Sequence, residues 1–232
     1  MSENQVMELP RLDRSRLAAP QVFEHLREQI ISLALSPGTT LSRMVLAKTF
    51  RLSSTPIRDA LMKLEEEQLV EIFPQHATVV SPIDLGLARQ AQFLRRSVEL
   101  EIVRTLAAKP DPLLLRRLEA TVERQEAVLR LNDLDEFISG DQLFHKAMYE
   151  AAGLPDLWLL VRRQSGHLDR LRRLHLPVPG KASDILKDHR SILDAISKGD
   201  AGTAEERLRR HLSNTLANID DIRSRFPNYI RD

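Results

Sequence analysis

The amino-acid sequence predicts a mainly α-helical protein made of two parts: a small N-terminal domain that ends in a β-hairpin, and a larger all-helical C-terminal domain. Apolar residues recur at helical spacing along most of the 232 residues, and the helix-favouring residues Leu, Ala, Arg and Glu are abundant. One segment near residue 75 departs from this pattern, because β-branched and aromatic residues there flank a turn. The length is enough for one large domain or two small ones.

Three helices are expected at the start of the chain. An apolar stripe begins after Pro20 and ends at "LSPGTT", where a Pro-Gly pair interrupts the helix. A short second helix starts at about Ser42, and the third reads "TPIRDALMKLEEEQLV", with Ser54 or Thr55 as its N-cap. The segment "VEIFPQHATVVSP" then predicts a two-stranded hairpin. This order of elements outlines a winged helix-turn-helix, although any small helical domain with a hairpin would give the same outline.

The rest of the chain predicts an antiparallel helical bundle. "SPIDLG", residues 81–86, looks like a linker, and no strand pattern follows it. Helices of bundle length, separated by short loops, are expected at residues 84–108, 111–130, 133–152, 155–175, 182–198 and 201–225. Short connections favour antiparallel neighbours. The predicted organisation is therefore a flexible tail at 1–14, a winged helix-turn-helix at 15–81 and an all-α domain at 82–228.

Composition limits the compartment and the kinds of site. The sequence contains no cysteine, which excludes disulfides and thiolate metal sites and fits a reducing compartment. It has no apolar run near the roughly 20 residues that span a bilayer, and its first residues lack the apolar core of a signal peptide. We therefore expect a soluble, cytoplasmic protein that does not bind membranes.

Charge alone gives only weak support for nucleic-acid binding. The net charge is +1, and residues 1–81 carry nine Lys or Arg against ten Asp or Glu, a net of −1. Between Thr40 and Leu64, however, there are five basic residues and only one acidic residue, Asp59. Such a patch can meet phosphates, but a solvated helix face explains it as well.

Four residues that can bind a metal point toward the interior of the predicted bundle. Asp141 and His145 lie one turn apart on the apolar face of its third helix, and His189 and His211 lie on the apolar faces of the last two. A lone histidine on such a face is more often a core residue bonded to a carbonyl. Burying four polar groups is costly unless they share a partner. Three imidazoles and a carboxylate suit Zn²⁺, with Ni²⁺ or Mn²⁺ as alternatives, and leave positions open for water or a ligand.

A centre of this composition also allows an enzyme. The alternative to a binding protein is a metal-dependent hydrolase or lyase with a His₃/Asp centre, fused to a winged helix. The sequence has no "HExxH" motif, and no general base clearly points inward beside the ligands. His167, on a stripe with Leu160 and Leu171, is expected to line the same cavity and is the one conceivable base. We therefore expect no catalytic residues.

Longer motifs resemble a known family. "SPGTTLSRMVLAKTFRLSSTPIRDALMKLEEEQLVEIFPQHATVV" resembles the winged helix of GntR-type bacterial transcription regulators. "FLRRSVELEIVRTLAA", "DQLFHKAMYEAAG" and "DHRSILDAISKGDAGTAEERLRRHL" resemble the FCD ligand-binding domain of the FadR branch, and the resemblance spans residues 15–228. It implies a homodimeric repressor that binds a palindromic operator and releases it on binding a small organic acid. The metal would anchor this carboxylic acid effector and do no chemistry.

The resemblance also assigns roles to residues. The third helix should lie in the major groove with its first residues facing the bases, and Arg58 is the strongest candidate for a base contact. Positively charged residues at the ends of the preceding helix are expected on phosphates, and the wing tip either enters the minor groove or is an exposed turn. The predicted DNA-binding residues are Arg43, Arg51, Ser53, Ser54, Thr55, Arg58 and His76.

For the effector, Arg95 matches the family's arginine four residues before a glutamate, here Glu99. Its guanidinium can hold a carboxylate in a fork. There are two alternatives: Arg95 forms only a surface ion pair with Glu99, or the match to the family motif is shifted by one residue and Arg96 takes this role. His167 is the second residue expected at the effector.

Overall fold

The computed structural model describes residues 12–74 and 76–232, so residues 1–11 of the predicted tail lie outside the described part of the chain. The protein divides into two compact units. One runs to Ile83 and also includes Asn228–Arg231, and the other contains Asp84–Pro227 and Asp232. The protein is mainly helical, with an N-terminal winged helix-turn-helix and a C-terminal helical domain, as the sequence predicts.

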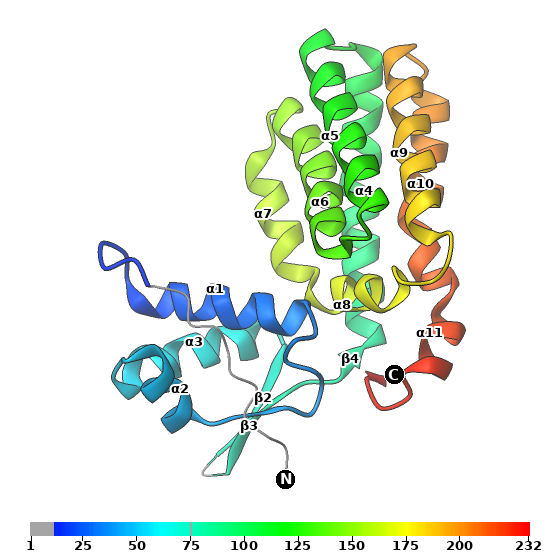
Figure 1. Cartoon of the computed structure of the whole chain (residues 1–232). Helices are drawn as coiled ribbons and strands as arrows, with labels where there is room; N and C mark the ends of the chain where they lie inside the picture. Colours follow the sequence, from blue (N-terminus) through cyan, green and yellow to red (C-terminus); the bar gives the residue numbers. More distant parts are fainter. Residues whose placement is uncertain (1–11, 75) are drawn as a thin grey trace. The chain divides into compact units, whose positions relative to one another are not determined.

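Three helices form most of the first unit: α1 (Ala18–Ile31), α2 (Arg43–Phe50) and α3 (Ser54–Glu66) (Figure 1). Ser42 caps α2, because its side chain accepts a hydrogen bond from the N–H of Val45, and α2 ends where Arg51 adopts a left-handed conformation with φ of 54°.

The expected N-cap of α3 was wrong by one residue, because Ser53 occupies that position in an extended conformation. The helix also ends four residues earlier than expected. Gln68 turns to a left-handed φ of 57°, and the chain enters a strand at Val70.

The wing is the predicted hairpin, formed by β2 (Val70–Phe73) and β3 (Ala77–Val80), which pair antiparallel from Val70 opposite Val80 to Phe73 opposite Ala77. A strand that the sequence did not predict, β1 (Thr40–Leu41), adds to the other side of β3. Two residues are too short for the alternation that identifies a strand. The core of this unit is formed by apolar side chains of the three helices and the sheet, among them Val22, Leu26, Ile30, Ile57, Leu61, Leu64 and Val80.

A second, two-stranded sheet contains residues near the C-terminus. β4 (Ile83–Asp84) pairs with β5 (Ile230–Arg231), and the N–H of Ile83 donates to the carbonyl of Tyr229 at 2.7 Å. The expectation that no strand follows residue 86 was therefore wrong at this one place. As with β1, the strand is too short to leave a pattern in the sequence.

Helices make up almost all of the second unit. Their bounds are α4 Leu85–Ala108, α5 Pro112–Arg130, α6 Leu134–Ala151, α7 Pro155–Gln164, α8 Gly166–His175, α9 Lys181–Ser197, α10 Ala201–Ala217 and α11 Ile219–Arg225. Four of the six predicted helices match within one residue at each end. The other two are each broken in two, at Ser165 and at Asn218. The side chain of each residue donates a hydrogen bond to a backbone carbonyl four residues earlier in the chain. Ser165 Oγ donates to the carbonyl of Val161, and Asn218 Nδ2 donates to the carbonyl of Asn214.

The long helices α4, α5, α6, α9 and α10 run side by side in Figure 1. α4 packs against α6, α8, α9 and α10, and α5 packs against α6 and α9. Their facing sides share one apolar core that includes Leu106, Leu118, Phe144, Ile192 and Leu208. No helix in residues 12–74 and 76–232 is long and apolar enough to cross a membrane.

Candidate functional site

Three helices of the second unit bring the predicted metal-binding residues together. Asp141 and His145 come from α6, His189 from α9 and His211 from α10. All four are buried, and one ligand atom from each lies within 4.8 Å of all the others. The apolar stripes of the sequence explain this, because each polar side chain replaces a core residue on the inner face of its helix.

The facing atoms are arranged as donors around a common point. Nε2 of His145 lies 3.2 Å from Nε2 of His211. Oδ1 of Asp141 lies 3.5 Å from Nε2 of His189 and 4.0 Å from Nε2 of His145. Oδ1 of Asp141 and Nε2 of His189 are buried and have no hydrogen-bond partner among the described residues. Buried polar atoms are rarely left in this state, so the donor set fits a cation bound among these four residues.

The opposite nitrogen of each imidazole faces an oxygen from the surrounding helices. Nδ1 of His145 lies 2.8 Å from Oε2 of Glu99. Nδ1 of His189 lies 3.0 Å from Oε1 of Gln125. Nδ1 of His211 lies 3.5 Å from Oδ2 of Asp188. An oxygen at Nδ1 favours the tautomer with its proton there and leaves the lone pair of Nε2 directed at the centre. Gln125 hydrogen-bonds Nδ1 of His189, and Glu99 and Asp188 lie beside Nδ1 of the other two rings, so all three rings can present Nε2 to the centre.

Gln125 and Gly140 were not recognised from the sequence, although both left a signal. Gln125 follows Leu118 and Val122 on the inner face of α5, so it is a polar residue on an apolar stripe. Gly140 lies inside α6, and a Cβ atom there would be 2.5 Å from Cγ of Gln125. The glycine lets α5 and α6 approach closely enough for Gln125 to reach His189. Phe144 closes the same region by stacking on the His189 ring at 4.0 Å between centroids.

The electrostatics favour the protonation states that a metal requires. Burial lowers the pKa of His145 to about 4 and the pKa of His189 well below its ordinary value. Burial alone would raise the pKa of Asp141, but Arg172 and the neighbouring histidines outweigh it and hold this pKa well below its usual range. At neutral pH His145 and His189 are therefore neutral and Asp141 is ionised, which are the metal-binding forms of these groups.

Arg95 is buried, with an exposed fraction of 6%, so the alternative of a surface ion pair was wrong. Its Nε donates to Oε1 of Glu99 at 2.7 Å, and the hydroxyl of Tyr149 donates to the same oxygen at 3.3 Å. Burial raises the pKa of Glu99, but Arg95 and His145 outweigh this and lower it to about 2. Glu99 therefore links the arginine to a ligand of the centre.

A cavity lies beside the cluster, with a volume of about 20 Å³, room for roughly one water molecule. It is lined by residues of α4, α8, α9 and α10: Gln92, Arg95, Leu168, Arg172, Lys181, Ile185, His211, Leu212 and Thr215. Neither Arg96 nor His167 is among them. His167 instead contacts residues outside this lining, since its Nδ1 accepts a hydrogen bond from the backbone N–H of Asp84 at 2.9 Å and is 3.0 Å from the guanidinium of Arg170. Arg172 and Lys181 line this cavity without having been recognised from the sequence.

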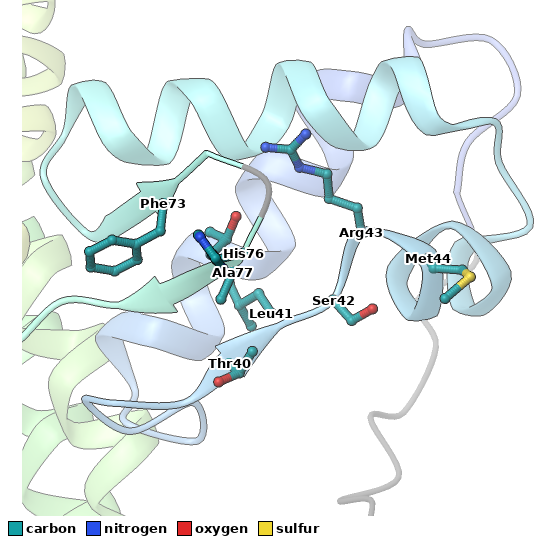
Figure 2. A pocket seen from close by; sticks show the side chains of 9 residues that line it. Thr40, Leu41, Ser42, Arg43, Met44, Phe73, His76 and Ala77 are labelled. Carbon is teal, nitrogen blue, oxygen red and sulfur yellow. The ribbon is translucent and has the colours of Figure 1, made fainter.

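The predicted DNA-binding residues are exposed on the winged helix-turn-helix. Arg43 begins α2, Arg51 ends it, and Ser53 to Arg58 form the first turns of α3. His76 lies at the tip of the wing, between β2 and β3. Figure 2 shows Arg43 and His76 among the side chains of a pocket of about 320 Å³ between the start of α2 and the wing, which Phe73 and Met44 also line.

Comparison with known proteins identifies the family of both units. Residues 18–80 match the bacterial regulatory proteins of the gntR family, and residues 90–214 match the FCD domain. An uncharacterized HTH-type transcriptional regulator in an unstable DNA locus of Streptomyces ambofaciens is 35% identical over 89% of this chain and 86% of its own length. The HTH-type transcriptional repressor RspR of Escherichia coli is 27% identical over 88% of this chain and 89% of its own length.

A solved structure shows the same fold. E. coli McbR/YncC superposes with a TM-score of 0.74 at 21% identity and covers 91% of this chain and 99% of its own. The family matches and the relatives are regulators, which sets aside the hydrolase or lyase alternative. The chain therefore belongs to the GntR family of bacterial regulatory proteins and is a DNA-binding transcriptional regulator with an FCD effector domain.

Proposed function

We propose that this regulator is a metal-containing repressor that a small organic acid releases from its operator. One observation carries the metal part: Asp141 Oδ1 and His189 Nε2 are buried, have no hydrogen-bond partner in the part of the chain that the structure describes, and lie within 4.8 Å of ligand atoms of His145 and His211. These four residues would hold a divalent ion, Zn²⁺ first and Ni²⁺ or Mn²⁺ as alternatives. When bound, the ion supplies a positive, Lewis-acidic anchor for an oxygen ligand, and the proposal includes no chemical turnover.

The effector part of the proposal rests on the cavity beside the cluster. His211 belongs both to the cluster and to the cavity lining, so a molecule in this cavity is adjacent to the ligands. Arg95 lines the cavity from α4, and its guanidinium can accept a carboxylate while Glu99 holds its Nε. A carboxylic acid is therefore the ligand that this lining favours. The cavity must widen to admit one, since its present volume is about 20 Å³.

Release from DNA requires that the effector bind one arrangement of the protein better than another. The cavity lining comes from α4, α8, α9 and α10, so a bound acid would draw these helices together. Typical coupling energies of about 1–3 kcal/mol would change operator affinity roughly 5- to 150-fold. The name of the relative RspR, a transcriptional repressor, supports repression as the direction of control.

On DNA, we propose that α3 enters the major groove with Ser53, Ser54, Thr55 and Arg58 toward the bases. Arg43 and Arg51 would contact phosphates, and His76 would reach the minor groove from the wing. One winged helix offers a small interface, so two copies of the chain would bind a palindromic operator as a homodimer. Binding to DNA and the absence of cysteine support the cytoplasm as the place of action.

The test combines three measurements on the purified full-length chain. Sedimentation should give a dimer, metal analysis should give about one divalent ion per chain, and a fragment of the adjacent upstream DNA should be retarded in a gel. Glycerate, gluconate and their oxidised or phosphorylated forms should weaken this DNA complex in metal-loaded protein and leave it unchanged in metal-free protein. Equal release of metal-free protein by an uncharged ligand would contradict the proposal.

A further inference from the structure

Lys181 is a largely buried lysine that has no ion-pair partner among the described residues. Only 9% of the residue is exposed, and it lines the cavity together with Arg95 and His211. Within residues 12–74 and 76–232, its ammonium makes no hydrogen bond, and no carboxylate oxygen lies within 4.0 Å of it. Lysine is rarely buried unless it is paired, so this position calls for an explanation.

The other two cations of the cavity differ from Lys181 in this respect. Nε of Arg95 is 2.7 Å from Glu99, and Arg172 pairs with Asp141 and Asp169. The carboxylates of α9 that act on Lys181 at longer range are already engaged. Asp184 pairs with Lys187 at 3.1 Å, and Asp188 pairs with Arg210 at 3.1 Å.

α9 begins at this end of the cavity, so the positive end of its dipole lies there, offset in part by the first-turn carboxylate of Asp184. Lys181 is the first residue of α9, and the N-cap, Gly180, has no side chain to accept from the first-turn N–H groups. Burial, and then the charge of Arg172, lower the pKa of Lys181 more than the distant carboxylates of Asp188 and Asp184 raise it, so its charged form is disfavoured. A bound anion would stabilise the charged form.

We propose that Lys181 binds a second anionic group of the effector, so that the effector is a small dianionic acid rather than a monocarboxylate. This inference rests on the proposed function. One carboxylate of the ligand would lie toward the cluster and Arg95, and a second carboxylate or a phosphate would lie against Lys181. Charge balance favours this class, because a divalent ion and Lys181 together add three positive charges next to a ligand set that contains one carboxylate, Asp141.

The experiment compares ligands that differ only at the far end of the molecule. Gluconate, glucarate and 6-phosphogluconate form one series, and glycerate, tartronate and 3-phosphoglycerate form a shorter one. Each is titrated calorimetrically into the zinc-loaded full-length protein. In at least one series the acids that carry a second anionic group should bind about tenfold or more tightly than the monoanion, since a hydrogen bond to a charged group contributes this much. The member that binds tightest distinguishes a carboxylate from a phosphate.

Lys181→Met keeps most of the apolar stem and removes the charge. It should abolish the preference for dianions and leave the affinity for the monoanion nearly unchanged, while Lys181→Arg should retain part of the preference. Lys198→Met, an exposed lysine at the other end of the same helix, is the matched control and should behave like the wild type. Without ligand, Lys181→Met should melt no lower than the wild type, because it removes an unpaired buried charge.

Two results would overturn the assignment, and they separate it from the proposed function. If zinc-loaded wild type shows no preference for a second anionic group in either series, or if Lys181→Met weakens both classes equally, Lys181 is not a second anion site and the acid-responsive regulator still stands. If no acid of either series binds zinc-loaded protein that still retards operator DNA, the effector part of the proposed function fails and the Lys181 assignment fails with it.

Discussion

His145 on α6 and His211 on α10 turn their Nε2 atoms toward each other at 3.2 Å. Each ring has its Nδ1 beside a carboxylate, Glu99 for His145 and Asp188 for His211. With the protons on Nδ1, the two lone pairs face each other, an arrangement that repels unless a cation lies between them. These distances fit the proposed metal site, in which a cation between the two Nε2 atoms takes the place of a hydrogen bond between them.

Metal removal should lower thermal stability. With free Zn²⁺ at about a thousand times its dissociation constant, binding would stabilise the fold by roughly 4 kcal/mol, which for a chain of this size is about 8–16 °C in melting temperature. Calorimetry of zinc-loaded protein with and without EDTA measures this shift. His189→Ala and Asp141→Ala should remove the response to EDTA. Asp135→Ala, an exposed carboxylate of the same helix α6, should keep it. A melt indifferent to chelator, from protein first shown to contain zinc, would contradict the prediction.

Gln125→Leu should weaken metal binding without removing a ligand. The substitution takes away the oxygen at 3.0 Å from Nδ1 of His189, and loss of such an outer partner typically costs about 10- to 100-fold in metal affinity. Competition with a chromophoric chelator gives the affinity. Gln164→Leu, an exposed glutamine on α7, serves as the control and should bind zinc like the wild type. Equal affinities for the Gln125 variant and the wild type would show that the outer oxygen is dispensable.

Gly140→Ala should destabilise the helical domain even though alanine favours helices. Its Cβ would be 2.5 Å from Cγ of Gln125, whose side chain is held by His189 and by the carbonyl of Phe137. Overpacking of this kind typically costs about 1–3 kcal/mol, more than the roughly 1 kcal/mol gained from helix propensity. Zinc affinity should fall in the same variant.

Gly202→Ala in the first turn of α10 is the matched control, because its Cβ would meet only Asp200 Oδ1 at 3.7 Å. Urea unfolding gives the free energy of unfolding of both variants. A Gly140→Ala protein at least as stable as Gly202→Ala would refute the close approach of α5 and α6.

Two arginines of the winged helix should affect DNA binding differently. Arg58→Ala is expected to lower operator affinity by about 1–3 kcal/mol and to relax sequence preference, as for the loss of one base contact. Arg43→Ala should weaken all sequences similarly and reduce the salt dependence by about one counterion. Fluorescence anisotropy over a range of salt concentrations separates the two effects, with Lys109→Ala of the helical domain as the control. If Arg58→Ala binds the operator as tightly as the wild type at every salt concentration, Arg58 does not contact the DNA.

The fold could be read largely from apolar periodicity, because each long helix buries one regular stripe. Periodicity did not show the breaks at Ser165 and Asn218, since apolar residues continue on both sides of each break. It also could not show β1 or β5, where two residues form each strand. Sequence patterns record which residues are buried over several turns, and they miss short pairings made by backbone groups.

The ligand cluster was predictable for the same reason, because Asp141 and the three histidines each interrupt an apolar stripe. Its surroundings were harder to predict. Asp188 sits next to a ligand in sequence but reaches the histidine of another helix, and Lys181 begins a helix after a loop, where a lysine is ordinarily exposed. The contacts of these residues depend on how α9 and α10 pack, which no local pattern encodes.

An anomalous diffraction map at the zinc edge, from crystals of the zinc-loaded protein, tests the metal site most directly. One strong peak per chain is expected among Oδ1 of Asp141 and Nε2 of His145, His189 and His211, at about 2.0–2.2 Å from each. If protein with one zinc per chain gives a peak elsewhere, or none among these four atoms, the cluster is a polar core and the metal-dependent switch is wrong.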